Sequence, residues 1–142
     1  MIWARGLGYA DLEKRIPATG HTAFHLASLT KTFASTIVMK LIEDGKVQLD
    51  DPALKYGVTL ASDGVIRVKH IFSHTSEGNP GERYQYNGAR FAELDKVIEK
   101  ASGKSFADLL MTDILDPLGM NEIRTFALSE NRPDSCAASN VG

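Results

Sequence analysis

The apolar positions between Leu29 and Asp44 predict a helix. They recur at spacings of three and four residues, as one face of a helix requires, and they are Phe33, Ile37, Val38, Leu41 and Ile42. Gly45 follows where a glycine commonly ends a helix. The pattern therefore places Ser28 at the start of this helix.

Three more helices follow from the same reasoning. The segment "RVKHIFSHT" predicts a short helix, and apolar residues at helical spacing predict another that Gly103 closes; these residues are Phe91, Leu94, Val97, Ile98 and Ala101. Ser105 and Asp108 match a capping box, which predicts a helix from Phe106 to about Leu115, before Pro117 and Gly119.

The remaining segments read as extended chain, turns and loops. "IWARGLGYADL" predicts an extended segment and "EKRIPATGHT" a turn, so a strand pair is expected ahead of Phe24. Between residues 46 and 64 we expect a looped connection that Val47, Leu49 and Leu54 pin to the core. "SEGNPGERYQYNG" is a loop between helices with two tyrosines at its far end.

Composition places the chain in the size range of one domain, and we expect a single domain over residues 1–142. Its 142 residues are 43% apolar and 24% charged, with a net charge of −2, which argues against disorder, a membrane span and a nucleic-acid partner. No signal peptide is recognisable near residue 1, and the cellular compartment stays open. Cys136, the only cysteine, cannot form an intrachain disulfide and is expected to be an incidental thiol.

Ser28 and Lys31 carry the candidate chemistry. Residues three apart share a helix face, so the lysine nitrogen can reach the serine oxygen and, if neutral, accept its proton. The positive end of the helix can also stabilise an anion that forms on an acyl substrate. The alternative is structural: a serine at a helix start caps a backbone N–H for about 1 kcal/mol. About one Ser-x-x-Lys match is expected by chance in a chain of this length.

Six ordered blocks favour the catalytic interpretation: "FHLASLTKTFAS", "LIEDGKVQLDDP", "VKHIFSHTSEG", "GERYQYNGARFAEL", "VIEKASGKSF" and "DPLGM". From about Trp3 to Thr125 they resemble the serine β-lactamase superfamily, in its penicillin-binding-protein-like, class C and esterase branch. The resemblance implies an α+β fold of the β-lactamase/transpeptidase type, of which this chain holds mainly the helical part plus N-terminal strands.

The resemblance also implies a function and a set of site residues. It implies a serine hydrolase that acts on an ester or amide (a β-lactam, a D-Ala-D-Ala peptide or a small ester) through an acyl-serine intermediate. Ser28 is then the nucleophile, Lys31 its proton-accepting partner and Tyr86 the tyrosine of a Tyr-x-Asn motif, which can shuttle protons. The alternative for Tyr84 and Tyr86 is that they only pack the loop.

Three departures from the family pattern lead to a second hypothesis. Gly88 stands where the motif has asparagine, so Asn87 is expected to substitute as a substrate-binding residue; Glu77 replaces a usual glycine; and the third motif, Lys-Thr-Gly or His-x-Gly, is absent. The alternative function is therefore a truncated or degenerate, non-catalytic member that acts as a binding or structural module. An incomplete domain also predicts self-association or a complementing segment, beside a small-molecule or peptide substrate.

Two weaker motifs receive structural explanations. His70 and His74 lie four residues apart, a spacing that can bind zinc, but Ile71 stands where an HExxH motif has glutamate and no third ligand is evident. We expect packing and hydrogen bonding there, with no metal and no cofactor. "ASDG" resembles the Ser-Asp-Asn element of class A relatives, yet it precedes "SHTS", so a turn is expected.

Overall fold

The computed structural model describes residues 3–120 and 123, in two compact units. One unit is Ala27–Asn121 and the other comprises the remaining residues. Cys136 and the segment from Ser129 onward lie outside the described residues.

The unit that includes residues 3–26 contains a small antiparallel strand pair, β1 (Tyr9–Asp11) and β2 (Ile16–Pro17). Tyr9 lies opposite Pro17 and Asp11 opposite Ile16, with an irregularity between Tyr9 and Asp11. The predicted strand pair is therefore present, although β2 falls inside the segment expected to be only a turn. Proline is tolerated because it lies at the end of a short edge strand.

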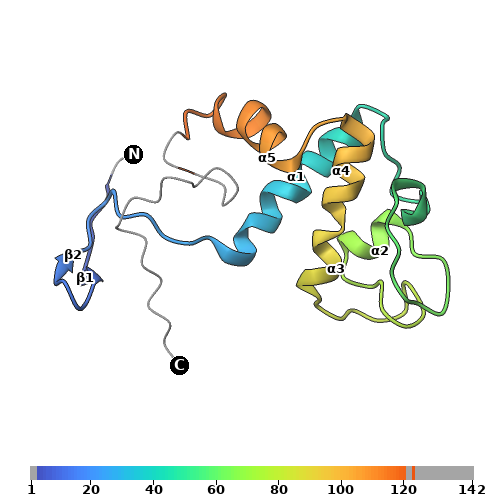
Figure 1. Ribbon diagram of the computed structural model, residues 1–142, viewed down its shortest axis with the longest axis horizontal. Helices are drawn as coiled ribbons and strands as arrows, with labels where there is room; N and C mark the ends of the chain where they lie inside the picture. Colours follow the sequence, from blue (N-terminus) through green and yellow to red (C-terminus); the bar gives the residue numbers. More distant parts are fainter. Residues whose placement is uncertain (1–2, 121–122, 124–142) are drawn as a thin grey trace. The chain divides into compact units, whose positions relative to one another are not determined.

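The unit Ala27–Asn121 is helical, and its longest helix is α1 (Thr30–Glu43), shown in blue to cyan in Figure 1. A 3-10 turn, η1 (Ala27–Leu29), precedes α1, and Gly45 follows it with a φ of +72°. α1 packs against α4 (Leu94–Ser102) and against a π-helical segment, η3 (Leu110–Leu115). The core here is made of Val38, Leu41, Leu94, Val97, Ile98 and Leu115, each at most 4% exposed.

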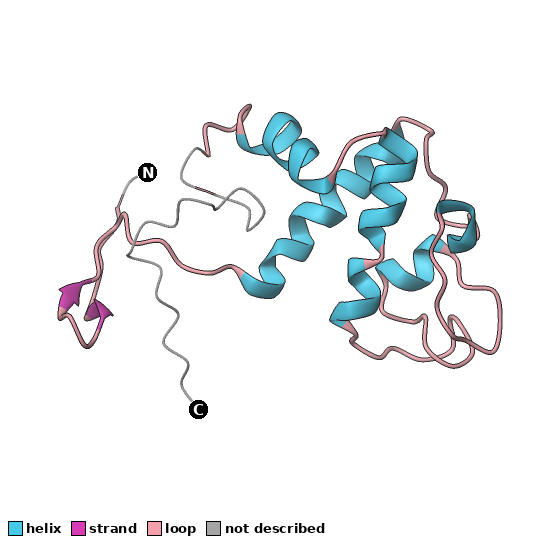
Figure 2. Cartoon of the chain, in the orientation of Figure 1, coloured by secondary structure: helices cyan, strands magenta, loops and turns pink. Residues whose placement is uncertain are grey.

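The other helices are shorter than the sequence pattern predicts. α2 spans Val68–Phe72, and the apolar stretch around residue 91 divides into α3 (Gly88–Ala92) and α4, with Glu93 between them. The capping box of Ser105 and Asp108 is present at α5 (Phe106–Leu109), after which the backbone continues as η3. Helical periodicity identifies these segments, but not the break between α3 and α4 (Figure 2) or the change from α-helix to π-helix after Leu109.

One prediction for the loop between residues 46 and 64 is wrong. Val47 is buried, but Leu54 is 68% exposed and Leu49 37% exposed. A 3-10 helix, η2 (Ala53–Tyr56), forms here instead. Because residues three apart align in such a helix, Ala53 and Tyr56 turn inward together and Leu54 faces solvent.

The helical unit explains how distant segments come together. α4 contacts α1, η2, α2, α3 and α5, so it is the element around which the other helices pack (Figures 1 and 2). Among the described helices, none is both long and apolar enough to cross a membrane.

Candidate active site

Ser28 lies in the η1 turn, immediately before α1, and its side chain is exposed. The residue before it, Ala27, has a φ of +46°. Left-handed backbone is costly for a residue with a Cβ, by about 1 to 2 kcal/mol, and such strain is often found at functional sites. The strained backbone at Ala27 thus directly precedes Ser28, in the 3-10 turn that leads into α1.

Lys31 lies one turn further along, and its Nζ donates a hydrogen bond to Ser28 Oγ at 3.1 Å. The N-cap residue of α1 is Leu29, and no side chain caps the helix there. The structural alternative for Ser28, a simple helix cap, is therefore not what the geometry shows. Ser28 uses its oxygen to contact other side chains instead.

Tyr86 comes from the loop ahead of α3, 58 residues along the chain from Ser28, and meets it directly. Its Oη lies 2.8 Å from Ser28 Oγ, and either oxygen can be the donor. The Lys31 Nζ lies 5.3 Å from the centre of the Tyr86 ring and 5.7 Å from that of Phe91. The three predicted catalytic side chains, Ser28, Lys31 and Tyr86, are thus in mutual contact.

The surroundings lower the pKa of Tyr86 below its usual value of 10.0. The hydrogen bond with Ser28 is the largest cause, and the neighbouring Lys31 ammonium adds to it. A phenol with a lowered pKa releases its proton more readily, which suits a group that passes protons. Tyr84, by contrast, only places its ring edge-on against His74, with the ring centres 6.0 Å apart.

Gly88 borders the same three side chains. A Cβ on Gly88 would lie 3.6 Å from Lys31 Nζ and 3.8 Å from Tyr86 Oη, which are ordinary contact distances. Position 88 therefore faces the candidate site, as the asparagine of a Tyr-x-Asn motif would. In this chain that place holds no side chain.

Asn87 has its side chain engaged within the protein. Its Oδ1 accepts the backbone N–H of Arg90 and caps α3, and its Nδ2 donates to Glu77 Oε1 at 2.6 Å. The proposed contact of Asn87 with substrate stays a prediction, because it requires at least one of these bonds to break. Glu77 itself was recognised in the sequence only as an added carboxylate.

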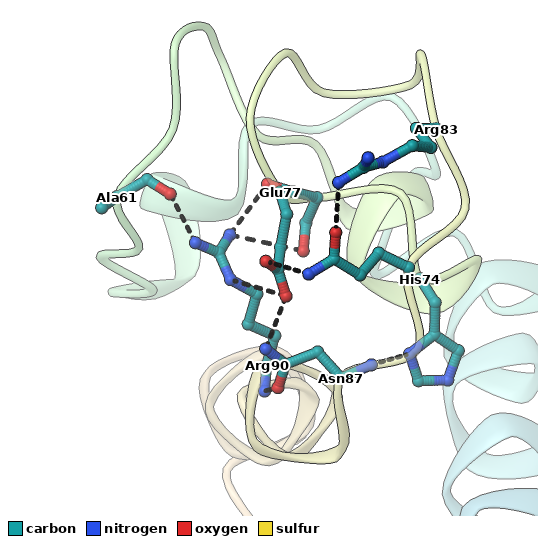
Figure 3. Close-up of polar contacts among 8 residues, drawn as sticks. Ala61, His74, Glu77, Arg83, Asn87 and Arg90 are labelled. Atoms are coloured by element: carbon teal, nitrogen blue, oxygen red, sulfur yellow. Dashed lines mark hydrogen bonds and ion pairs between the residues drawn. The ribbon is translucent and has the colours of Figure 1, made fainter.

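Two residues near Tyr86 were missed as site residues. His74, considered only as a metal ligand, stacks on Phe91 with ring centres 5.2 Å apart and lies against Tyr86 in a tilted arrangement, with ring centres 4.7 Å apart. Glu77 binds the side chain of Asn87 (Figure 3). The signal available in the sequence was their position, since "SHTSEG" stands shortly before the loop that carries Tyr86.

The remaining sequence motifs, around His70 and in "ASDG", form local hydrogen bonds within the fold. The Nδ1 of His70 accepts the backbone N–H of Arg67 at 3.2 Å, which is an ordinary hydrogen bond at the start of α2. Among the residues that the structure describes, no cluster of three or more histidine, cysteine or acidic side chains could hold a metal ion. In "ASDG", the Ser62 hydroxyl donates to the Gly64 carbonyl within a bend.

Comparison with solved structures defines the class of fold. The chain is similar to an octameric penicillin-binding protein homologue from Pyrococcus abyssi, with a TM-score of 0.78 and 29% identity, over 84% of this chain and 36% of that one. A penicillin-binding protein from Bacillus halodurans matches with a TM-score of 0.75 and 25% identity, over 91% and 50%. The fold is thus of the β-lactamase/transpeptidase type, in agreement with the predicted fold class.

Sequence comparison then gives the family. The family model described as Beta-lactamase matches residues 1–139, and this chain belongs to that family. It is 28% identical to penicillin-binding protein 4* of Bacillus subtilis, over 96% of this chain and 38% of that protein. It is also 28% identical to a D-aminopeptidase of Gluconobacter oxydans, over 91% and 31%. The chain therefore spans between about a third and two fifths of these relatives, which include hydrolases.

Proposed function

We propose that this chain is the nucleophile-bearing part of a serine hydrolase that forms an acyl-enzyme on Ser28. The observation that carries the proposal is the contact of an exposed serine hydroxyl with both a lysine and a tyrosine, at 3.1 and 2.8 Å. A serine is a weak nucleophile at its ordinary pKa and needs an adjacent base. Two side chains contact Ser28 Oγ: Tyr86 can accept its proton as a phenolate, and Lys31 can accept it when neutral or, as an ammonium, stabilise that phenolate.

Protons follow a short path in the proposed reaction. The base is the Tyr86 phenolate, which the Lys31 ammonium stabilises. Ser28 Oγ attacks the carbonyl carbon of an ester or amide while its proton passes to Tyr86 Oη, which becomes a neutral phenol. Tyr86 then gives this proton to the leaving oxygen or nitrogen as the bond to the carbonyl carbon breaks. In the second half, a water molecule loses a proton by the same path and attacks the acyl group, which releases a carboxylic acid and restores Ser28.

The relatives support the chemical class of substrate. Besides the D-aminopeptidase, a teichoic acid D-alanine hydrolase of Staphylococcus aureus is 28% identical over 81% of this chain. We extend to this chain a substrate with an ester or amide carbonyl: a β-lactam, a D-Ala-D-Ala peptide or a small ester. Fold alone would not support this step, because one fold can host many functions; the contacts of Ser28 do.

A covalent probe tests the proposal directly. Purified protein is treated with a fluorescent β-lactam or a fluorophosphonate, and the labelled peptide is identified by mass spectrometry. We expect the label on Ser28, loss of labelling in Ser28→Ala and normal labelling in Ser35→Ala, which changes a serine on the same helix. A folded sample that neither probe labels would refute the proposal.

A second candidate function is a non-catalytic binding or structural module, which Gly88 favours because the motif's amide is missing. Hydrolysis of p-nitrophenyl acetate distinguishes the two functions, since only the enzyme gives turnover that Ser28→Ala abolishes. We also propose that the site is completed by self-association or by a complementing segment. The Pyrococcus abyssi homologue is octameric, and size-exclusion chromatography with light scattering tests whether this chain associates.

A further inference from the structure

Tyr86 lies between two residues whose backbone is fixed by His74. The N–H of Gln85 donates to the His74 carbonyl at 2.7 Å, and the N–H of Asn87 donates to His74 Nδ1 at 3.2 Å. Residues on both sides of the tyrosine are thus held by the backbone and the ring of one histidine. His74 has a φ of +56°, so its own backbone takes an uncommon conformation where it holds them.

Glu77 holds the side chains of the same two residues. Its Oε2 accepts Gln85 Nε2 at 2.8 Å, and its Oε1 accepts Asn87 Nδ2 at 2.6 Å. Each carboxylate oxygen therefore binds one neighbour of Tyr86; the bond to Asn87 is visible in Figure 3. Hydrogen bonds to a charged acceptor are roughly twice as strong as neutral ones.

Arg90 supports Glu77 from the start of α3. Its Nε lies 3.9 Å from Glu77 Oε1, while its other nitrogens donate to the carbonyls of Ser76 and Ala61 (Figure 3). A half-buried carboxylate needs such compensation for the water it has lost. Arg90 thus offsets the charge of Glu77 while Glu77 binds Gln85 and Asn87.

The ring of His74 adds a third contact. It lies against the Tyr86 ring at a tilt of 34°, with ring centres 4.7 Å apart, and Phe91 stacks against the histidine in turn. To accept a hydrogen bond at Nδ1, His74 must carry no proton on that nitrogen. Burial and the nearby Lys31 ammonium both lower the pKa of His74 below its usual 6.5, which favours the neutral ring.

We propose that His74 and Glu77 form a clamp on Gln85 and Asn87 that positions the Tyr86 phenol against Ser28. The four hydrogen bonds fix the backbone and side chains on both sides of Tyr86, and the His74 ring against Tyr86 holds the phenol toward Ser28. His74 and Glu77 are positioning residues, since they act through Tyr86. The role of the clamp in catalysis rests on the function proposed above, but the position of Tyr86 can be measured without turnover.

The first measurement is the pKa of Tyr86, followed by NMR of protein labelled with 13C at tyrosine Cζ, with Tyr86→Phe to assign the signal. In Glu77→Gln, an NH2 group replaces one of the two acceptor oxygens, so a donor then faces the amide donor of Gln85 or of Asn87. In His74→Ala the acceptor and the stacked ring are both lost. We expect the pKa of Tyr86 to rise toward 10 in each, because the bond to Ser28 that lowers it is broken.

Rescue separates positioning from general stability. His74→Asn should keep the lowered pKa of Tyr86, because an asparagine oxygen can replace Nδ1 as acceptor and asparagine tolerates a positive φ. His70→Asn and Glu82→Gln are the matched controls. His70 also accepts a backbone N–H through Nδ1, and Glu82 also binds an asparagine amide, that of Asn79, outside the clamp. Both controls should leave Tyr86 unchanged.

Gln85→Ala provides a milder test if Glu77→Gln or His74→Ala does not fold, because it removes one amide of the clamp without touching the core. An unchanged Tyr86 pKa in the folded clamp variants would overturn the proposal. In an active protein we also expect acylation to slow about tenfold with little change in KM, as loss of a positioning hydrogen bond implies. If Ser28 is never acylated but the Tyr86 titration behaves as described, the function fails while the clamp stands.

Discussion

Asp51 offers a quantitative test of the structure, because one of its carboxylate oxygens collects three hydrogen bonds. Oδ2 accepts from the Tyr56 hydroxyl at 2.6 Å, from Lys55 Nζ at 2.9 Å and from the backbone N–H of Gln48 at 2.9 Å. These bonds join the last two residues of η2 to the segment before it. Asp51→Asn removes the charge and brings an amide donor toward three other donors, so the turn should be destabilised.

The magnitude follows from the pKa of Asp51. The bond from Tyr56 is the largest cause and Lys55 the next, and together they lower the pKa from 3.8 to about 2. At about 1.36 kcal/mol per pH unit, the difference of about 1.8 corresponds to roughly 2.4 kcal/mol of stability at neutral pH. Because the Lys55 partner is 55% exposed and water screens the ion pair, we expect about 1 to 2 kcal/mol.

The lowered pKa of Asp51 also fixes how its contribution to stability changes with pH. A carboxyl group whose pKa is lower in the folded state stabilises fully above its unfolded value of 3.8, and that contribution is lost as the pH falls through about 2. Urea unfolding of wild type and Asp51→Asn, followed by circular dichroism from neutral pH down to about pH 2, measures both effects. The two proteins should differ at neutral pH and converge in acid.

Asp50→Asn is the matched control. Asp50 is the neighbouring residue and also pairs with a lysine, Lys69, but its side chain is 69% exposed. Its loss should therefore affect stability less than the loss of Asp51. Equal stability of Asp51→Asn and wild type at neutral pH, or a difference that persists unchanged to the acid end, would show that the reasoning is wrong.

Three further changes test the core and the site. Leu94→Ala should cost about 2 to 5 kcal/mol in urea unfolding, because Leu94 is 0% exposed at the centre of the helical unit; a loss below about 1 kcal/mol would contradict this packing. Lys31→Met should raise the pKa of Tyr86, measured by NMR, because the ammonium that favours the phenolate is gone; an unchanged value would place the lysine elsewhere. Gly88→Asn should speed acylation by roughly 5- to 160-fold, since an amide beside the site adds a hydrogen bond of about 1 to 3 kcal/mol to the transition state, whereas Ala89→Asn should not.

The sequence predicts local features of this fold better than its irregular ones. The C-terminal glycine of α1 and the capping box at Ser105 depend on a few neighbouring residues, and both are present. The burial of Ala53 and Tyr56 could not be predicted from the sequence. Leu54 lies between them and is equally apolar, yet its side chain is exposed. Periodicity cannot distinguish an exposed leucine from a buried one in a short irregular segment.

The candidate site divides in the same way. The pairing of Ser28 with Lys31 is local, because a helical turn brings residues three apart together whatever the rest of the chain does. The contact with Tyr86 spans 58 residues and was reachable only through resemblance to a family. The positions of His74 and Glu77 relative to Tyr86 depend on hydrogen bonds between loop residues, and no periodic pattern encodes those.

The replacement of glycine by Glu77 and of asparagine by Gly88 can be understood together. Of the two positions that follow Tyr86, only Asn87 carries an amide, and Glu77 binds it while Asn87 also caps α3. Glu77 thus engages the Asn87 amide within the protein, and Gly88 leaves open the space next to Lys31. Because Glu77 also belongs to the clamp on Tyr86, Glu77→Gly alone should slow acylation, whereas Gly88→Asn alone should speed it. If Glu77 also keeps Asn87 from the substrate, the acylation rate of the double variant, measured by probe labelling, should differ from the product of the two single effects. That non-additivity would separate an exchange of roles between neighbours from two independent losses.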